Sequence, residues 1–267
     1  MSTQLSDILR NHVKEKLARG EVVASMTVRL VRSIEIARIA RTAGFDTLYI
    51  DVEHSSFSLD TTGQICMAAL EVGITPLVRV PTTRPEHVSR ALDGGALGVI
   101  APHVRSAEDA RKVVAAAKFP PLGERSAAGG LPHLQFRSFP AREANPALND
   151  ATMVVVMMET VAALERVEEI AAVEGIDMML IGTNDLTAEM GIPGQYEHEK
   201  VHEAYTRTIA ACRKHGKHVG VGGLASRPDL MARFVQLGAR YVSTGTDLAF
   251  LIGACTQKAK QVREVML

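Results

Sequence analysis

Residues 153–185 read MVVVMMETVAALERVEEIAAVEGIDMMLIGTND and contain a complete strand–helix–strand unit. The apolar run Thr152–Met158 predicts a strand, the helical pattern Val161–Ala171 follows it, and Met178–Ile181 predicts the next strand. Gly175 stands just before the second strand, where glycine supplies the left-handed residue that ends a helix. Because nearly continuous apolar strands are buried on both faces, the unit predicts a parallel sheet covered by helices.

The same alternation recurs along almost the whole chain of 267 residues. The predicted strands are Val22–Val31, Thr47–Ile50, Thr75–Val80, Leu97–Ala101, Thr152–Met158, Met178–Ile181, His218–Val221 and Tyr241–Thr244. The predicted helices include Leu5–Ala18, Ile34–Ala43, Ala107–Ala117, Val161–Ala171, Val201–His215 and Pro228–Leu237. Eight such units favour an α/β fold of the closed (β/α)8 kind, a TIM barrel with an additional N-terminal helix, over an open doubly wound sheet. No long linker or shift of composition divides the chain, so we expect residues 1–267 to form a single domain.

Charge, cysteine content and hydropathy exclude several classes of protein. Lys+Arg and Asp+Glu number 30 each, so no net field would draw the chain to nucleic acid or to an acidic membrane. The cysteines Cys66, Cys212 and Cys255 lack CxxC spacing and indicate buried or free thiols in a reducing compartment. No apolar stretch approaches a membrane span, and the first residues hold no apolar signal core. We therefore expect a soluble, cytoplasmic protein.

Two acids follow neighbouring strands of the predicted barrel. Glu159 comes directly after Met158, and Asp185 comes four residues after Ile181. Residues beyond the carboxyl ends of barrel strands face the catalytic mouth. An acid just past a buried strand is costly unless it is paired or bound to metal, and two of them together indicate a hard divalent cation held by oxygen ligands. The alternative for either acid alone is that it caps the helix that follows.

The second and third predicted strands also end in ionisable residues. The second runs into Asp51-Val52-Glu53-His54, and His54 is the best candidate general base because only histidine titrates near neutral pH unperturbed. A nearby carboxylate would orient its ring and raise its basicity. Arg79 lies inside an apolar strand, where its guanidinium suits a carboxylate or an enolate. The alternatives are a capping or solvated loop role for His54 and a purely structural ion pair for Arg79.

Three other features of the sequence bear on the site. The irregular segment Lys118–Asn149, rich in Pro and Gly, is expected to leave the fourth strand at the barrel mouth and cover the site, unless it is a tolerated surface insertion. Residues His198–His202 match H-E-x-x-H, but their polar flanks indicate a solvated helix start rather than a zinc site. Gly220–Gly223 follows the seventh strand and could cradle a phosphate or leave room for substrate.

Six strings, in order and with similar gaps from about Gly20 onward, resemble the HpcH/HpaI aldolase family: FDTLYIDVEHSSF, PLVRVP, ALDGGALGVIAPHV, FPPLGERS, MMETVAALERVEEI and GIDMMLIGTNDLTAEMG. The family includes 4-hydroxy-2-oxoheptane-1,7-dioate aldolase and 2-dehydro-3-deoxyglucarate aldolase. The resemblance implies a (β/α)8 fold and a metal-dependent class II aldolase. Such an enzyme would cleave or form 4-hydroxy-2-oxo acids, with pyruvate or a related 2-oxo acid and an aldehyde as partners.

The resemblance also implies a metal and an acid–base system. Glu159 and Asp185 would bind Mg²⁺ or Mn²⁺, with Co²⁺ or Zn²⁺ as alternatives. His54 would be the catalytic base, and Asp93 would match the acid that raises its basicity. Asp51 would lie near the same histidine.

Substrate binding and assembly follow from the same resemblance. Arg79 would stabilise the enolate, and the backbone around Asn184 and Asp185 would hold pyruvate. Met157 would lie beside the substrate, where many family members carry a glutamine. The family commonly forms hexamers that exchange the last helix, so a hexamer or trimer is expected, and the apolar positions of Leu248–Met266 are compatible with such a helix.

The chain departs from the family pattern in ways that leave the substrate open. Met157 cannot make the hydrogen bond of a glutamine amide, and Gly182–Leu186 reads GTNDL where the family often has GPADL. The first strand lacks the usual tryptophan and carries Arg29 and Arg32, which indicate an acidic acceptor. No lysine stands at a recognisable Schiff-base position. The competing hypotheses are a citramalyl- or malyl-CoA type lyase and a barrel that binds an oxo acid without catalysis.

Overall fold

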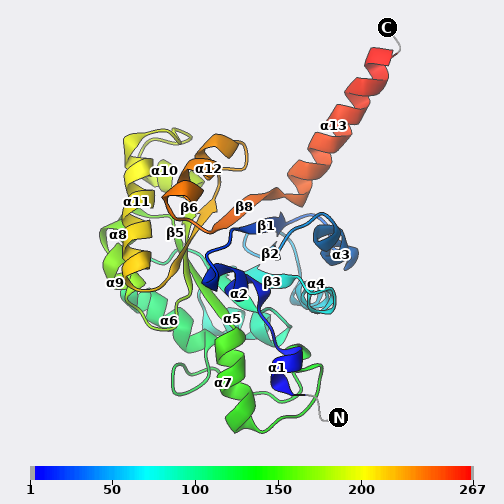
Figure 1. Ribbon diagram of the computed structural model, residues 1–267, viewed down its shortest axis with the longest axis vertical. Coiled ribbons are helices and arrows are strands. Elements are labelled where there is room, and N and C mark those ends of the chain that lie inside the picture. Colours follow the sequence, from blue (N-terminus) through cyan, green and yellow to red (C-terminus); the bar gives the residue numbers. More distant parts are fainter. Residues whose placement is uncertain (1–3, 266–267) are drawn as a thin grey trace.

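Eight parallel strands close into a barrel in sequence order in the computed structural model, which describes residues 4–265 (Figure 1). The strands are β1 (Val23–Val28), β2 (Thr47–Asp51), β3 (Thr75–Arg79), β4 (Gly98–Ala101), β5 (Met153–Met158), β6 (Met178–Gly182), β7 (His218–Gly222) and β8 (Tyr241–Thr246). Each strand pairs in parallel with the next, and β8 pairs with β1. The prediction of a (β/α)8 barrel is therefore confirmed.

Helices surround this barrel, and several of them begin at a residue whose side chain caps the first turn. They are α1 (Leu5–Ile8), α2 (His12–Ala18), α3 (Glu35–Thr42), α4 (Leu59–Glu71), α5 (Pro85–Asp93), α6 (Ala107–Ala117), α7 (Ala141–Ala151), α8 (Val161–Glu165), α9 (Val167–Ala171), α10 (Thr183–Glu189), α11 (Glu199–Lys214), α12 (Pro228–Leu237) and α13 (Asp247–Val265). Ser58, Ser106 and Thr160 each accept a backbone N–H at the start of α4, α6 and α8. Such caps satisfy N–H groups that the first helical turn leaves without partners.

The interior of the barrel is filled with side chains at one end only. Tyr49, Leu77, Met157, Leu180 and Tyr241 belong to the inner cluster, which also includes Val13 and Leu17 of α2. Helix α2 therefore closes the amino-terminal end of the barrel, and space for a ligand remains at the carboxyl ends of the strands.

The predicted helix Leu5–Ala18 is broken in two at Asn11. The Asn11 amide donates to the carbonyl oxygens of Leu97 (3.1 Å) and Ala151 (2.8 Å). Its side-chain oxygen accepts the N–H of Lys14 at 3.1 Å, so the same residue starts α2. A buried asparagine that bonds to barrel backbone fixes the chain in a non-helical conformation at this point.

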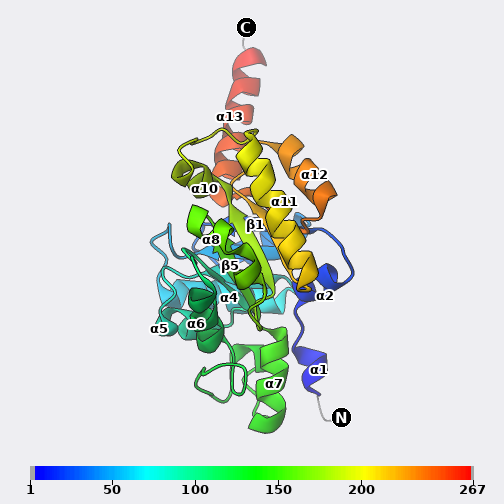
Figure 2. The same ribbon diagram turned by 90° about the vertical axis from the view of Figure 1, so that its left-hand side faces the viewer.

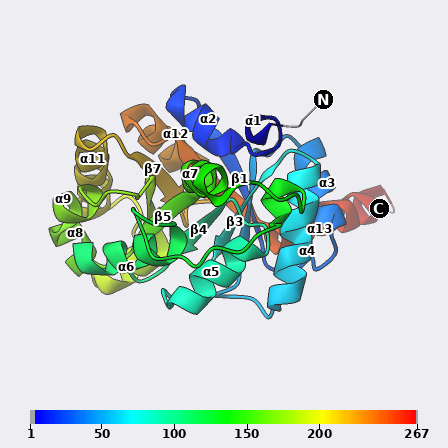
Figure 3. The ribbon, with the colours of Figure 1, turned by 90° about the horizontal axis from the view of Figure 1, so that it is seen from below.

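The segment Lys118–Asn149 does not cover the barrel mouth, so that expectation was wrong. Helix α6 follows β4 and carries the chain back to the amino-terminal end before the segment starts. The segment continues into α7, which lies near α1 at the end of the molecule opposite to α13 (Figures 1 and 3). The ammonium of Lys118, which is buried, donates to the carbonyl oxygen of Asn149 at 2.6 Å and anchors the segment there.

Helix α13 projects away from the barrel (Figure 2). It bears out the predicted helix over Leu248–Met266, although Met266 lies outside the described residues. Its first residue, Asp247, accepts the backbone N–H groups of Arg29 (3.0 Å), Leu30 (2.9 Å) and Val31 (2.8 Å). This carboxylate ties the start of α13 to the end of β1. Within residues 4–265, no helix is long and apolar enough to cross a membrane.

Candidate active site

A cavity of about 530 Å³ opens at the carboxyl ends of the strands. Its lining includes Thr27, Arg29, Tyr49, Asp51, His54, Arg79, Met157, Gly182, Asn184, Asp185, Ser226, Ser243 and Thr246. Six of the eight residues to which the sequence gave a catalytic, substrate-binding or metal role share this cavity: Asp51, His54, Arg79, Met157, Asn184 and Asp185. Arg29 lines it too. Glu159 lies against Gly182, at the edge of this cavity.

Asp51 is held between two arginines. Nε of Arg79 donates to its Oδ1 at 2.8 Å, and Nη2 of Arg79 donates to its Oδ2 at 2.6 Å. Nε of Arg29 donates to the same Oδ2 at 2.6 Å. Burial opposes the charge of Asp51, but these guanidinium contacts hold the pKa of its carboxyl below the ordinary value. Asp51 is thus a charged counter-ion that fixes both arginines.

Arg79 is both paired and available to a ligand. Its Nη1 lies 2.9 Å from Oε2 of Glu53, and its guanidinium lies over the ring of Tyr49 at 5.5 Å. Burial lowers the pKa of Arg79, but Asp51 and Glu53 raise it above its ordinary value, with the Asp51 hydrogen bond as the main contribution. Nη1 also approaches Sδ of Met157 at 3.8 Å, and a thioether is a weak acceptor. A substrate oxygen can therefore replace the methionine contact without breaking the ion pairs.

His54 lines the cavity with a half-exposed ring. Its contact with Asp51 is through the backbone, because the N–H of His54 donates to Oδ1 at 3.2 Å. The carboxylate beside the ring is that of Glu53, whose Oε2 lies 3.7 Å from Nε2. The sequence placed an acid next to His54, and the structure identifies Glu53 as that acid.

Asp93 does not meet His54 within the chain. It is the last residue of α5, and its carboxylate accepts a hydrogen bond from Nη2 of Arg125 at 2.7 Å. A helix that follows a barrel strand runs back from the mouth, so its last residue lies near the amino-terminal ends of the strands. The role that the resemblance implied for Asp93 thus has no contact to support it within residues 4–265.

Glu159 is buried, and its carboxylate meets His103, a residue of the string ALDGGALGVIAPHV for which the sequence predicted no role. Oε1 accepts the backbone N–H of His103 at 2.6 Å and lies 3.0 Å from Nδ1 of the same residue. Nε2 of His103 lies 2.8 Å from Oε1 of Glu53, so the ring connects the two acids. His103 has a φ of 57°, an uncommon conformation for a non-glycine residue, and the sequence gives no local signal for it.

Glu159 and Asp185 are neighbouring carboxylates, the type of ligand that a hard divalent cation prefers. Burial raises the pKa of Glu159 above its ordinary value, and the nearby Asp185 carboxylate raises it further. A Cβ on Gly182 would lie 3.0 Å from Oε2 of Glu159, so the glycine leaves room beside that oxygen. Among the described residues, no group of three or more His, Cys, Asp and Glu side chains is placed to hold a metal. The two acids would therefore bind an ion whose other ligands are water and substrate.

The remaining predicted residues take distinct positions. Sδ of Met157 faces both Arg79 and the hydroxyl of Tyr49, at 3.9 Å from the latter. Asn184 accepts a hydrogen bond from the Tyr196 hydroxyl at 2.8 Å. Gly223 adopts a φ of +80°, and a Cβ there would lie 3.1 Å from the backbone nitrogen of Asn184. The glycine-rich loop thus allows β7 and α10 to approach each other closely.

Three motif residues lie outside the cavity lining. His198 caps α11, with its Nδ1 accepting the N–H of Lys200 at 3.2 Å, and His202 contacts Thr206 within the same helix. These local contacts support the interpretation of a helix start rather than a zinc site. Arg32 donates to Ser56 and lies over the ring of Phe57, 5.6 Å from its centroid.

Comparison with known proteins identifies the family of the chain. The profile of the HpcH/HpaI aldolase/citrate lyase family matches residues 30–254. The chain is 39% identical to a 4-hydroxy-4-methyl-2-oxoglutarate aldolase of Chaetomium globosum over 258 residues, which is 96% of each chain. It is 31% identical to a 2-keto-3-deoxy-L-rhamnonate aldolase of Escherichia coli K12, over 95% of this chain and 94% of that one.

The fold agrees as well. The crystal structure of an HpcH/HpaI aldolase from Desulfitobacterium hafniense DCB-2 superimposes with a TM-score of 0.90 at 33% identity, covering 95% of this chain and 97% of that chain. The match of sequence and fold extends over nearly the whole chain. The protein therefore belongs to the HpcH/HpaI aldolase/citrate lyase family and is a carbon–carbon lyase of the aldolase type.

Proposed function

We propose that the enzyme cleaves and forms 4-hydroxy-2-oxo acids, with pyruvate or a related 2-oxo acid as one product and an aldehyde or other carbonyl compound as the second. The observation that carries this proposal is the pair of neighbouring carboxylates, with Asp185 in the lining of the cavity that Arg79 also lines and Glu159 at its edge beside Gly182. No lysine lines that cavity among the described residues, so imine chemistry has no candidate nucleophile there. The relatives named as aldolases favour this reaction over acyl-CoA cleavage and over binding without turnover.

The residues of the chain divide the work of cleavage. Glu159 and Asp185 would hold a divalent ion, Mg²⁺ or Mn²⁺ in our proposal, which would supply Lewis-acid polarisation of the 2-oxo acid. His54 accepts the proton of the 4-hydroxyl group as the C3–C4 bond breaks and C4 becomes a carbonyl carbon. The electron pair of that bond passes to C3 and gives an enolate, whose negative charge Arg79 stabilises. Return of a proton to C3 then completes the 2-oxo acid.

The ion pairs around Arg79 explain how its position is kept during this reaction. Nε and Nη2 of Arg79 donate hydrogen bonds to Asp51, and Nη1 forms an ion pair with Glu53. The guanidinium is therefore pre-oriented and needs no rearrangement when charge develops on the substrate. In this proposal Asp51 acts as a positioning residue for Arg79.

We also propose that the protein is a homo-oligomer, a hexamer or a trimer, assembled through α13. Leu248, Phe250, Leu251 and Ile252 are exposed apolar residues at the start of that helix. Burial of such side chains against another subunit would remove apolar surface from water. Light scattering coupled to size-exclusion chromatography measures the mass directly. The cytoplasmic location stays a prediction from the sequence.

Metal removal tests the proposed reaction. Pyruvate release from 4-hydroxy-2-oxo acids is measured before EDTA treatment, after it, and after Mg²⁺, Mn²⁺, Co²⁺ or Zn²⁺ is restored. We expect Glu159→Gln to lower the metal-restored activity at least about 100-fold, because one of two ionised ligands is lost. The matched control is Glu165→Gln, an exposed residue of α8.

Calorimetry adds a measurement that does not depend on turnover. Because the pKa of Glu159 is raised, protons should compete with the metal at a higher pH than they would at an ordinary glutamate. Metal affinity should therefore weaken as the pH falls toward that raised pKa. Pyruvate release that is indifferent to chelation and to Glu159→Gln would remove the proposal.

A further inference from the structure

The cavity has two chemically different walls. The acids Glu159 and Asp185 belong to the β5–β6 side, and Arg79 extends from β3. The closed order of eight strands places β1 across the barrel from β5. The β1 and β8 wall therefore faces the part of the substrate that points away from the metal ligands.

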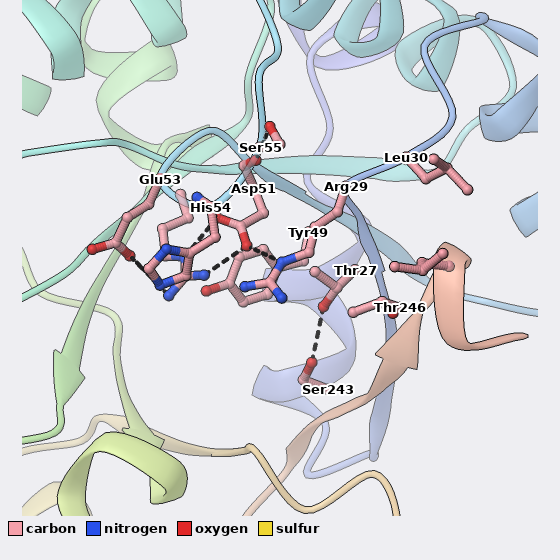
Figure 4. A network of polar contacts seen from close by, with 12 residues as sticks. Thr27, Arg29, Leu30, Tyr49, Asp51, Glu53, His54, Ser55, Ser243 and Thr246 are labelled. Carbon is pink, nitrogen blue, oxygen red and sulfur yellow. Dashed lines mark hydrogen bonds and ion pairs between the residues drawn. The ribbon is translucent and has the colours of Figure 1, made fainter. Parts of the chain in front are cut away.

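Arg29 supplies a guanidinium on that wall that is paired with Asp51 through one nitrogen and keeps unused donors. It lies just past the end of β1, and Figure 4 shows its side chain extending toward Asp51. Only its Nε is used, in the 2.6 Å hydrogen bond to Asp51. Within residues 4–265, neither amino nitrogen of its guanidinium has a hydrogen-bond partner, and 35% of the side chain is exposed. Arg79, by contrast, already contacts two carboxylates.

Hydroxyl groups lie on the same wall as Arg29. Oγ1 of Thr27 and Oγ of Ser243 are 3.1 Å apart, so one of the two donates its hydrogen to the other. The second hydroxyl hydrogen of that pair is left to donate toward the cavity. Thr27 and Ser243 both line the cavity, and their strands β1 and β8 are neighbours in the sheet.

The backbone beneath Arg29 is fixed. Its N–H donates to Oδ1 of Asp247 at 3.0 Å, and the Nε contact to Asp51 holds the guanidinium plane. The two amino nitrogens therefore present their hydrogens from a restrained orientation. A restrained guanidinium with both amino nitrogens unused suits a planar carboxylate, which accepts parallel hydrogen bonds from that pair of nitrogens.

We propose that Arg29 binds a carboxylate group on the carbonyl acceptor, with the Thr27–Ser243 hydroxyl pair as an additional donor. This proposal rests on the aldol function proposed above, and it makes the preferred substrates 4-hydroxy-2-oxo dicarboxylates. The acceptor carbonyl faces the enolate, and its carboxylate lies against the β1–β8 wall. An aldehyde without a negative charge leaves the amino groups of Arg29 to water and gains nothing from them.

Matched acceptors test the proposal in the metal-loaded enzyme. The kcat/KM for aldol addition of pyruvate is compared for glyoxylate against glycolaldehyde and for 4-oxobutanoate against butanal. We expect Arg29→Met to lower the charged-to-neutral ratio roughly 10- to 100-fold, as for loss of charge-assisted hydrogen bonds. Arg29→Lys should restore part of the ratio, because charge returns without the planar fork. Arg32→Met is the matched control and should keep the wild-type ratio, since Arg32 lies outside the cavity.

A binding measurement separates this proposal from the aldol function. Titration of the full chain in EDTA with 4-hydroxybutanoate and with butane-1,4-diol measures the preference for a carboxylate without turnover. Wild-type protein that prefers the carboxylate through Arg29 but shows no metal-dependent aldol reaction would reject the proposed function and support this site. An unchanged ratio in Arg29→Met, or an equal loss for charged and neutral acceptors, would overturn the assignment of Arg29, since the residue would then act only through Asp51.

Discussion

Replacement of Asp51 by asparagine should destabilise the protein strongly. The Asp51 side chain is fully buried and carries the negative charge that two arginines share. An asparagine can accept with its one oxygen, but its NH2 group would face guanidinium donors. The substitution therefore leaves Arg79, which is only 6% exposed, with a single remaining carboxylate partner in Glu53.

The size of the effect follows from how strongly the two guanidinium groups depend on this one carboxylate. Removal of one partner from a buried ion pair costs about 3–5 kcal/mol. Three short guanidinium hydrogen bonds end on Asp51, so we expect the full range to apply. A protein of this size loses roughly 2–4 °C of melting temperature per kcal/mol, which corresponds to a fall of about 6–20 °C.

Reversible urea unfolding of the metal-free protein, supported by calorimetry, measures this change. The control is Asp60→Asn on α4, where an exposed carboxylate accepts a hydrogen bond from Gln64, and a change within about 0.5 kcal/mol is expected there. Asp51→Asn combined with Arg79→Met should cost less than the sum of the single changes, because the two residues interact directly. If Asp51→Asn proved no more harmful than Asp60→Asn, the view of Asp51 as a buried counter-ion would be refuted.

Two further predictions concern the metal ligand and the closed end of the barrel. Gly182→Ala would place a Cβ 3.0 Å from Oε2 of Glu159. The metal affinity measured by calorimetry should therefore fall roughly tenfold or more, as it does when groups that support a ligand are displaced. Gly253→Ala, which has open space around it, is the control, and equal metal affinities of the two variants would contradict the reasoning. His133 has its pKa lowered by burial to about 4 from an ordinary 6.5, so the unfolded chain takes up its proton first. The free energy of unfolding should therefore decline by up to about 3 kcal/mol as the pH falls from roughly 6.5 to 4. In urea unfolding, His133→Gln should show a weaker decline between these pH values. An identical pH dependence in the variant and the wild type would exclude His133 as the cause.

The barrel could be predicted from the sequence because its strands are buried on both faces. Runs such as Met178–Ile181 contain no polar alternation, and each predicted strand overlaps an observed one. The first run was predicted too long, since Arg29 turns into the cavity and the strand ends at Val28. Breaks made by long-range contacts, such as the bonds of Asn11 to distant carbonyl groups, leave no local signal.

The site was predictable where chemistry follows directly on a strand. Asp51, His54 and Arg79 gather in one cavity because the carboxyl ends of parallel strands meet there. His103 stands two residues past the end of β4, so the same reasoning could have marked it, but its left-handed backbone conformation and its contact with Glu159 have no local signal. Asp93 shows the opposite case, since a string that resembles the family does not tell which end of a helix its acid will occupy.

The arrangement of the two ends of the barrel matters to anyone who wishes to attach the enzyme to a surface. Helix α1 and α7 lie at the closed end, whereas α13 departs beside the open end (Figure 1). Immobilisation through an anchor on α7 would turn the opening toward the solution. A support linked to α13 would instead crowd the entrance and strain the hydrogen bonds between Asp247 and the backbone that follows β1. The two immobilised preparations should therefore differ in apparent KM, although they contain the same enzyme.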